Sequence, residues 1–289
     1  MANNKMILEE KSRDIGNFVV GRLLPVREKR QVGPFTFIDH MGPSLIGKDK
    51  YVDVDQHPHI GLSTLTYLFE GEIAHRDSTG AHQVITPGDV GFMTSGSGVT
   101  HTERTPQYLR GKAPHTLHGY QVWVALPKEK EEMSPRFDFI PKTDLPRWQE
   151  NDLIFTLVAG EGYGKKSPLP VYSPLFMVDI KATKSTWLDL QGQLEGEIAV
   201  VVVKGKVTDD SNTVEAGQML VSKTENECCL QLAADTQLLL FGGQPLPEPR
   251  YLFWNFVSSS RDRLKKASED WKNKQFPKVP GDDTYIPVP

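Results

Sequence analysis

Hydrophobic and polar residues alternate along most of this chain in short runs. Seven runs combine the alternation with β-branched or aromatic residues, and Gly, Pro, Asn and Asp residues separate them. These predicted strands are residues 35–39, 63–68, 119–126, 154–158, 175–180, 198–203 and 236–241. Because they recur along nearly the whole chain, the pattern predicts an all-β protein.

One segment near the C-terminus has helical periodicity. Three apolar residues share one helical face: Leu264, Ala267 and Trp271. Ser259 precedes them as the predicted N-cap, and Asp262 lies where a carboxylate stabilises a helix N-terminus. We predict a short helix near residues 260–273 that packs on the β core. The tail at residues 276–289 is rich in proline and is predicted to lie extended over the surface.

Two stretches of the chain form a weak internal repeat. Residues 67–90 and 201–220 both read as strand, tight turn, strand and a second turn that contains glycine. Two glycine pairs align in this comparison: Gly71 with Gly205, and Gly88 with Gly217. The repeat predicts two domains of similar architecture.

The composition fits an ordinary globular protein of two domains. The 289 residues are 38% hydrophobic and 24% charged, and the net charge of −4 offers no basic surface for nucleic acid. A charged, proline-rich segment at residues 127–148 interrupts the strand pattern and marks the predicted junction. We therefore predict an N-terminal domain at 1–135 and a C-terminal domain at 136–289, which includes the helix and the tail.

Several features exclude other protein classes. The N-terminus has charges where a signal peptide needs an apolar core, and no apolar run approaches membrane-spanning length. The adjacent Cys228 and Cys229 cannot form an ordinary disulfide and match no zinc motif. The glycine-rich run at 160–165 lacks phosphate-loop spacing and is predicted to be a flexible loop. We predict a cytoplasmic protein, or a nuclear one in a eukaryote, that binds neither membrane nor nucleic acid.

The strongest chemical signal is a pair of alternating motifs. His57 and His59 form H-x-H, while His101 and Glu103 form H-x-E. Alternate residues of a strand share a face, so each pair can direct both side chains to one point. The two pairs can return to the same place in a barrel. Four converging nitrogen and oxygen donors predict a metal site.

The second copy of the repeat lacks these donors. The repeat alignment places four other residues at the equivalent positions: Gln191, Gln193, Leu230 and Leu232. All eight histidines of the chain lie at or before position 118. One metal per chain, in the N-terminal domain, is therefore predicted.

The remaining histidines are expected to have lesser roles. His75 and His82 flank a predicted hairpin and are expected to be exposed or hydrogen-bonded to Asp77. Asp39 or His40 could orient a ligand imidazole from outside the metal site. Two others are expected to be structural or surface groups: His115 and His118.

Two long stretches read HPHIGLSTLTYLFEGEIAHRDSTG and ITPGDVGFMTSGSGVTHTE, and two shorter ones read FTFIDHMGP and GGQPLPEP. Together they closely resemble the pirin family of the cupin superfamily. The resemblance implies two cupin barrels (double-stranded β-helix, jelly-roll) that face each other, with iron in the first only. It places the metal ligands on His57, His59, His101 and Glu103. One departure is Ile60, where many pirins carry arginine near the pocket mouth.

The donor set favours iron(II). Three neutral imidazoles and one carboxylate leave a divalent ion with a net charge near +1, and octahedral geometry keeps two positions free. Zinc would instead close a tetrahedron with these groups. We expect one iron(II) per chain, with Zn, Mn, Ni or Cu as substitutes in vitro.

The resemblance implies quercetin 2,3-dioxygenase activity on a flavonol or related enol with O₂. The flavonol would bind through its 3-hydroxyl, lose that proton to Glu103, and open its heterocycle with release of carbon monoxide. Glu103 could also be a ligand alone. The rival interpretation is a non-catalytic redox regulator that binds a transcription factor or metabolic enzyme. A third is a sugar isomerase that uses zinc or manganese. A monomer is expected, because the two barrels can cover each other's open faces.

Overall fold

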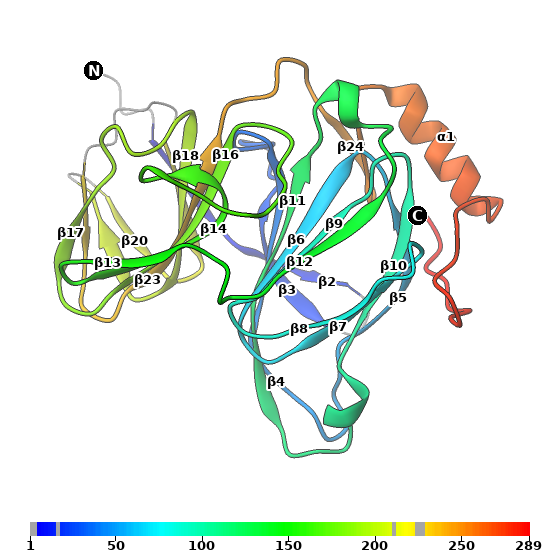
Figure 1. The fold of residues 1–289 in the computed structure, drawn as a ribbon, viewed down its shortest axis with the longest axis horizontal. Helices are drawn as coiled ribbons and strands as arrows, with labels where there is room; N and C mark the ends of the chain where they lie inside the picture. Colours follow the sequence, from blue (N-terminus) through cyan, green and yellow to red (C-terminus); the bar gives the residue numbers. More distant parts are fainter. Residues whose placement is uncertain (1–4, 16–17, 210–211, 223–228) are drawn as a thin grey trace. The chain divides into compact units, whose positions relative to one another are not determined.

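The computed structural model describes residues 5–15, 18–209, 212–222 and 229–289. This part of the chain forms two compact units built from antiparallel sheets (Figure 1). The unit called here the first barrel comprises Ser12–Arg22, Phe37–Lys142 and Pro247–Pro289. The second barrel comprises Met1–Lys11, Leu23–Thr36 and Thr143–Leu246. The predicted all-β class with one short C-terminal helix is confirmed within the described residues.

The first barrel contains a seven-stranded sheet in the order β12-β9-β6-β11-β4-β3-β2, a four-stranded sheet in the order β5-β10-β7-β8, and the β24-β25 pair. Its strands are β2 (Lys11–Asp14), β3 (Val19–Leu24), β4 (Phe35–Ile46), β5 (Asp53–His59), β6 (Leu62–Glu70), β7 (Ile73–Asp77), β8 (His82–Ile85), β9 (Val90–Thr94), β10 (Val99–Arg104), β11 (His115–Ala125), β12 (Arg136–Ile140), β24 (Tyr251–Phe253) and β25 (Phe256–Ser258). Its helices are α1 (Arg261–Lys272) and two 3₁₀ turns at Gln107–Leu109 and Lys128–Lys130.

The second barrel contains an eight-stranded sheet, with the order β1-β21-β18-β23-β16-β14-β13 and β15 paired to β14, and a four-stranded sheet, β17-β22-β19-β20. Its strands are β1 (Lys5–Glu9), β13 (Arg147–Glu150), β14 (Leu153–Gly162), β15 (Lys165–Lys166), β16 (Leu175–Ala182), β17 (Thr186–Asp189), β18 (Glu197–Lys204), β19 (Lys206–Thr208), β20 (Thr213–Glu215), β21 (Gln218–Ser222), β22 (Cys229–Leu232) and β23 (Gln237–Gly243). The seven predicted strands lie within strands of the two barrels, apart from Leu126 and Thr236, which fall one residue outside.

The internal repeat appears as a shared topology. The strand order β9-β6-β11-β4 in one barrel matches β21-β18-β23-β16 in the other. Gly71 follows β6 with φ 78°, and Gly205 follows β18 with φ 82°. Gly88 and Gly217, which precede β9 and β21, have φ values of 86° and 83°. Each turn needs a left-handed residue, which explains why glycine recurs at both aligned positions.

The proline-rich segment at 127–148 supplies one edge strand to each barrel. Among the described strands, β12 pairs only with β9 and β13 only with β14, so each lies at an edge where proline nearby is tolerated. The chain passes from the first to the second barrel between Lys142 and Thr143. The helix and tail belong to the first barrel, although they are distant in sequence. The division into domains 1–135 and 136–289 stays a prediction.

The C-terminal helix begins one residue later than predicted. Ser260 is its N-cap, and its side chain accepts a hydrogen bond from the Arg263 amide. Ser259 does not cap the helix because its amide and hydroxyl both bind the Glu131 carboxylate, at 2.8 and 3.1 Å. The predicted apolar face is buried and packs against Ile60 and Phe256. Ile60 therefore contributes to the core beneath α1.

The tail after α1 is extended, as predicted, and lies along β5 (red in Figure 1). Its main contact is Gln56, whose amide nitrogen donates to the carbonyls of Asp282 and Thr284 at 2.8 and 3.1 Å. The Val279 amide donates to the Gln56 side-chain oxygen at 2.8 Å. Gln56 is buried, so the tail is attached to the strand that carries His57 rather than loosely covering the surface.

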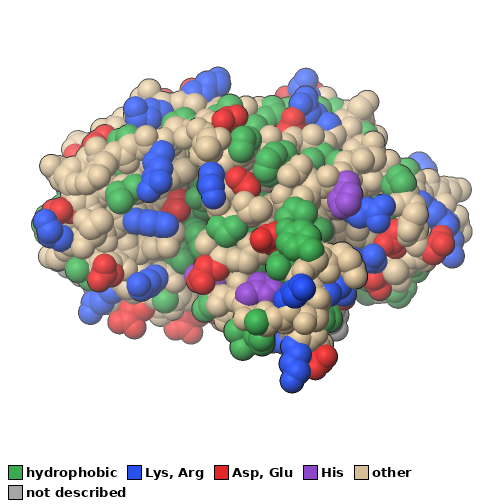
Figure 2. Space-filling view, turned by 60° about the horizontal axis from the view of Figure 1, so that its bottom comes forward, with side chains coloured by type: hydrophobic (Ala, Val, Ile, Leu, Met, Phe, Trp, Pro, Cys, Tyr) green, Lys and Arg blue, Asp and Glu red, His purple; other side chains and the backbone are tan. Residues whose placement is uncertain are grey.

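No helix among the described residues is long and apolar enough to cross a membrane. Acidic and basic side chains are interspersed over the face drawn in Figure 2. Cys229 is exposed, and Cys228 lies outside the described residues.

Candidate metal centre

Strand register brings the two histidine motifs together in the first barrel. β5 and β10 are antiparallel neighbours, and His57 lies opposite His101 in the ladder. A register irregularity between His101 and Glu103 offsets the end of β10. All four residues of the motifs are buried, so their polar atoms face the barrel interior rather than solvent.

Three imidazoles converge on one point. The Nε2 atoms of His59 and His101 lie 3.1 Å apart, and the ring centroids of His57 and His101 are 4.2 Å apart. One ligand atom from each of His57, His59 and His101 lies within 4.8 Å of the others. Such a cluster of nitrogen lone pairs suits a metal cation.

Each of these imidazoles has a partner for its other nitrogen. His57 Nδ1 contacts the Asp55 carbonyl at 2.8 Å, and His59 Nδ1 contacts the Asn255 carbonyl at 3.1 Å. Because a carbonyl only accepts, both Nδ1 atoms carry hydrogen and both Nε2 atoms keep a lone pair. His101 Nδ1 lies 3.4 Å from Nδ1 of another histidine, His75.

The three imidazoles are neutral at physiological pH. Burial lowers the pKa of His57 to about 4, against the smaller opposing effect of the Asp55 carbonyl. Burial and the neighbouring imidazoles hold the pKa values of His59 and His101 well below their ordinary range. Neutral imidazole is the form that binds metals, so no proton has to leave before binding.

Glu103 is held apart from the three-histidine group. Its Oε1 accepts a hydrogen bond of 2.6 Å from Gln121 Nε2. Burial raises the pKa of Glu103, while His75 and the Gln121 hydrogen bond oppose that rise. Glu103 belongs to a second potential metal group, with His75 and His101. The two groups share His101.

His75 is the site residue that the sequence interpretation undervalued. It is buried, with an exposed fraction of 2%, so of the two expected alternatives, exposure or a hydrogen bond to Asp77, exposure does not hold. The expected hydrogen bond to Asp77 is confirmed, with His75 Nε2 3.0 Å from Asp77 Oδ2. The His75 ring stacks on Phe137 at 4.3 Å. The H-x-D spacing, which equals that of H-x-H and H-x-E, was the available signal.

Asp77 is a buried, ionised carboxylate. Burial would raise its pKa, but hydrogen bonds from His75 and Thr79 outweigh burial and lower the pKa below its ordinary value. Its Oδ1 also accepts from the amides of Thr79 and Ala81, at 2.8 and 3.2 Å. The same carboxylate therefore closes the β7–β8 turn and binds His75.

Asp39 and His40 have other partners. Arg22 binds Asp39 through two hydrogen bonds of 2.8 Å, and His40 Nε2 lies 2.9 Å from His118 Nε2. His82, unlike His75, is exposed as expected. His75 contacts a clustered imidazole, with its Nδ1 3.4 Å from His101 Nδ1. The orienting role of Asp39 or His40 stays a prediction.

The second barrel has leucine where the first has histidine. Leu188 lies opposite Leu230 in the β17–β22 ladder, as His57 lies opposite His101. This register corrects the repeat alignment, since Gln191 and Gln193 are exposed residues beyond β17. Four leucines fill the equivalent positions of the buried core: Leu188, Leu190, Leu230 and Leu232. Among the described residues, both potential metal groups lie in the first barrel.

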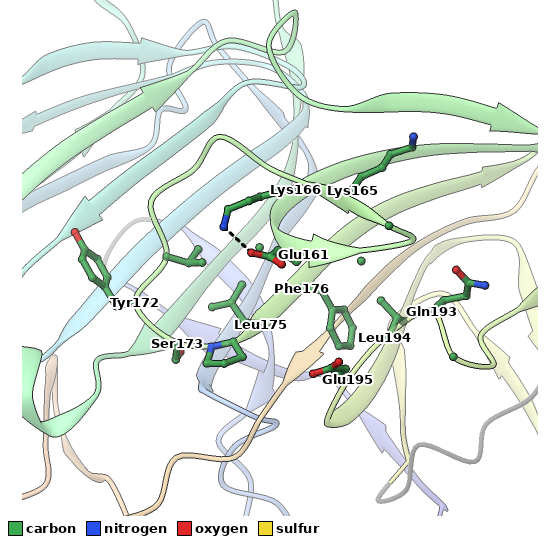
Figure 3. A pocket seen from close by; sticks show the side chains of 16 residues that line it. Glu161, Lys165, Lys166, Tyr172, Ser173, Leu175, Phe176, Gln193, Leu194 and Glu195 are labelled. Atoms are coloured by element: carbon green, nitrogen blue, oxygen red, sulfur yellow. Dashed lines mark hydrogen bonds and ion pairs between the residues drawn. The ribbon is translucent and has the colours of Figure 1, made fainter.

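A surface cavity of about 820 Å³ lies in the second barrel (Figure 3). The glycine-rich run at 160–165 forms part of its wall as a β14–β15 hairpin, so the predicted flexible loop is wrong. The hairpin forms because Tyr163 and Gly164 adopt positive φ, as its tight turn requires. Lys166 binds Glu161 across the hairpin at 2.6 Å.

Comparisons with known proteins agree over nearly the whole chain. Residues 17–124 match the family model described as Pirin, and residues 177–277 match the Pirin C-terminal cupin domain. A pirin-like protein of Caulobacter vibrioides is 43% identical, over 98% of this chain and 99% of the relative. The matches confirm a cupin domain in each half.

Solved structures give the same answer. A crystal structure of quercetin 2,3-dioxygenase from Acinetobacter baumannii has a TM-score of 0.91 and 35% identity, over 99% of this chain and 95% of that one. The Escherichia coli pirin YhhW, solved in complex with nickel(II), has a TM-score of 0.65 and 19% identity, covering 84% and 100%. The second likeness is one of fold alone.

Proposed function

Since the chain belongs to the pirin family, we propose that its first barrel binds one iron(II) and cleaves flavonols as a quercetin 2,3-dioxygenase does. The convergence of three neutral, buried imidazoles carries the proposal. The similarity to the Acinetobacter enzyme supports the substrate class. The proposed ligands are the residues that both spacing and family resemblance select: His57, His59, His101 and Glu103.

The residues present fit such an ion. Three imidazole nitrogens are already neutral, and a carboxylate lies beside one of them. This mixed set suits iron(II), although nickel, copper and zinc compete in vitro by the Irving–Williams order. When bound, iron(II) would supply the Lewis acidity and redox chemistry that the reaction of a flavonol with O₂ requires.

Glu103 is the proposed acceptor of the flavonol 3-hydroxyl proton. Gln121 holds its Oε1, so Oε2 is the atom that would serve either as a metal ligand or as the acceptor of that proton. Its raised pKa makes the carboxylate a stronger base than an exposed glutamate. Gln121 therefore orients the base, while burial tunes its basicity.

The surroundings of the site limit access of water. Trp123 lies edge-on to His59, at 5.1 Å between ring centroids, and stacks on Phe37 at 3.8 Å. Both aromatic rings are buried. Burial strengthens the electrostatic effect of the carboxylate and disfavours hydrolytic side reactions.

The test is anaerobic loading with iron(II), followed by addition of quercetin and O₂. We expect the loss of quercetin absorbance and the uptake of O₂ to be coupled, and His101→Ala to abolish both. Protein that binds one iron but consumes no flavonol or related enol would refute the enzyme proposal. That outcome would favour the regulator, whose partner affinity would differ between iron(II) and iron(III).

A further inference from the structure

His101 differs from His57 and His59 in the group that contacts its Nδ1 atom. Backbone carbonyls fix the tautomers of His57 and His59. At His101, by contrast, the nearest partner of Nδ1 is a side chain, His75 Nδ1 at 3.4 Å. A side chain can carry hydrogen on either ring nitrogen, so this contact alone does not decide the His101 tautomer.

Asp77 determines the His101 tautomer through its hydrogen bond with the other ring nitrogen of His75. An ionised carboxylate can only accept, so His75 Nε2, 3.0 Å from Asp77 Oδ2, carries the hydrogen. With its hydrogen on Nε2, His75 presents the Nδ1 lone pair, which accepts from His101 Nδ1 at 3.4 Å. This leaves the lone pair of His101 on Nε2, the atom that lies 3.1 Å from His59 Nε2.

The chain geometry keeps this arrangement rigid. In the β7–β10 ladder Asp77 lies opposite His101, and His75 lies opposite Glu103, so the residues share the interior face. Asp77 is fully buried and His75 nearly so. Phe137 stacks on the His75 ring, and the Thr79 amide fixes Asp77 at 2.8 Å.

We propose that Asp77 and His75 are positioning residues that fix the tautomer of His101 and increase its affinity for the metal. The inference rests on the proposed metal site and extends it. Neither residue needs to touch the ion. Partners of this kind typically change metal affinity by about 10–100-fold.

Asp77→Asn is the most discriminating variant. The asparagine oxygen can still accept from the Thr79 and Ala81 amides, so the turn is preserved. Its amide group, however, donates to His75 Nε2 and reverses the His75 tautomer, which turns Nδ1 into a donor that opposes His101 Nδ1–H. Asp89→Asn is the matched control, because Asp89 is also a buried carboxylate that closes a turn, through Thr86 and Lys142.

Two substitutions of His75 distinguish its packing from its role as hydrogen-bond acceptor for His101. His75→Leu removes the acceptor, whereas His75→Asn places an amide oxygen near the former position of Nδ1. We expect His75→Asn to bind nickel(II) nearly as wild type does, and His75→Leu to bind it about 10–100-fold more weakly. His82→Asn, at an exposed histidine of the same hairpin, is the control.

The measurements are nickel(II) affinity, by competition with a chelator, and imidazole ¹⁵N spectra of the metal-free protein. In wild type, His101 should carry hydrogen on Nδ1; in Asp77→Asn it should shift towards the Nε2–H form, with about 10–100-fold weaker nickel binding. An unchanged His101 tautomer with unchanged nickel affinity would overturn the proposal. Two nickel ions per wild-type chain would also overturn it, since His75 would then be a ligand.

These measurements do not depend on turnover. If wild-type protein binds nickel and shows the expected tautomers but cleaves no flavonol, the proposed function fails while the positioning role stands. If flavonol is cleaved and Asp77→Asn leaves tautomer and affinity unchanged, the reverse holds.

Discussion

At the scale of single residues, the site depends on spacing that is visible in the sequence and on partners that are not. The H-x-H and H-x-E motifs predicted the two segments that meet, because alternate strand residues share a face. The H-x-D spacing marked His75 but not its contact with His101, and no motif marked Gln121, because both residues reach the site from other strands. Asp39 and His40, selected from sequence, bind Arg22 and His118.

Glu103→Gln tests the proposed proton acceptor. The amide keeps the shape of the side chain but cannot take a proton, so we expect flavonol cleavage to fall by about 10²–10⁴-fold. Quercetin absorbance and O₂ uptake, at matched metal content, measure the change. Glu195→Gln, at an exposed carboxylate of the second barrel, should leave the rate unchanged. A wild-type rate in Glu103→Gln would remove this residue from the chemistry.

At the scale of elements, equivalent strand pairs in the two barrels have diverged. The β5–β10 pair carries clustered imidazoles, whereas the β17–β22 pair carries leucines of the hydrophobic core. The sequence alignment of the repeat paired His57 with Gln191, three residues after the true equivalent, Leu188. The error arose because the turn after β17 is longer than the turn after β5. Only the ladder register aligned Leu188 with His57.

Leu230→Ala tests whether the second barrel uses this position for packing. Removing a fully buried leucine should lower the free energy of unfolding by about 2–5 kcal/mol, through lost burial and the cavity left behind. Urea-dependent hydrogen exchange of β22 measures it. Trp187→Ala, at an exposed residue on the neighbouring strand, should cost about 0.5 kcal/mol or less. Equal costs would contradict a core role for Leu230.

Asp282 gives the attachment of the tail a pH dependence. Burial would raise the pKa of Asp282. The hydrogen bonds from Thr284 and the ion pair with Arg104 outweigh burial and lower that pKa below 3.8. A lowered pKa stabilises the folded state above the unfolded pKa, and the contribution is lost as pH falls through the folded value.

The corresponding variant is Asp282→Asn. We expect its melting temperature to lie below that of wild type at pH 7, and the difference to shrink as pH falls below 3.8. Thermal unfolding followed by circular dichroism at several pH values measures this. The neighbouring Asp283, which is 97% exposed, provides the control Asp283→Asn. A difference that grows at acid pH would contradict the assignment.

At the scale of the whole molecule, binding of a metal ion should stabilise the first barrel and not the second. Both potential metal groups of the described residues lie in the first barrel, and leucines occupy the equivalent core of the second. A ligand that binds only the folded state stabilises the part of the protein whose unfolding releases the ligand.

Some amides of β5 and β10 exchange only when the first barrel opens. Nickel(II) at 100 times its Kd should slow the exchange of these amides by about 100-fold. Exchange in β17 and β22 should not change. Mass spectrometry of peptides from both barrels measures the effect, and a chelator should reverse it. The effect should disappear in His57→Ala. Equal slowing in both barrels would contradict a single site.

The sequence by itself determined the all-β class, the two-fold repeat, the short helix and the four residues with ligand spacing. These follow from periodicity, turn glycines and motif spacing, which are local properties of the chain. The tertiary structure alone decided which strands are neighbours. It therefore placed His75 and Asp77 beside His101, attached the tail to Gln56, and aligned Leu188 with His57. Such pairings join residues far apart in sequence, where no local pattern records the contact.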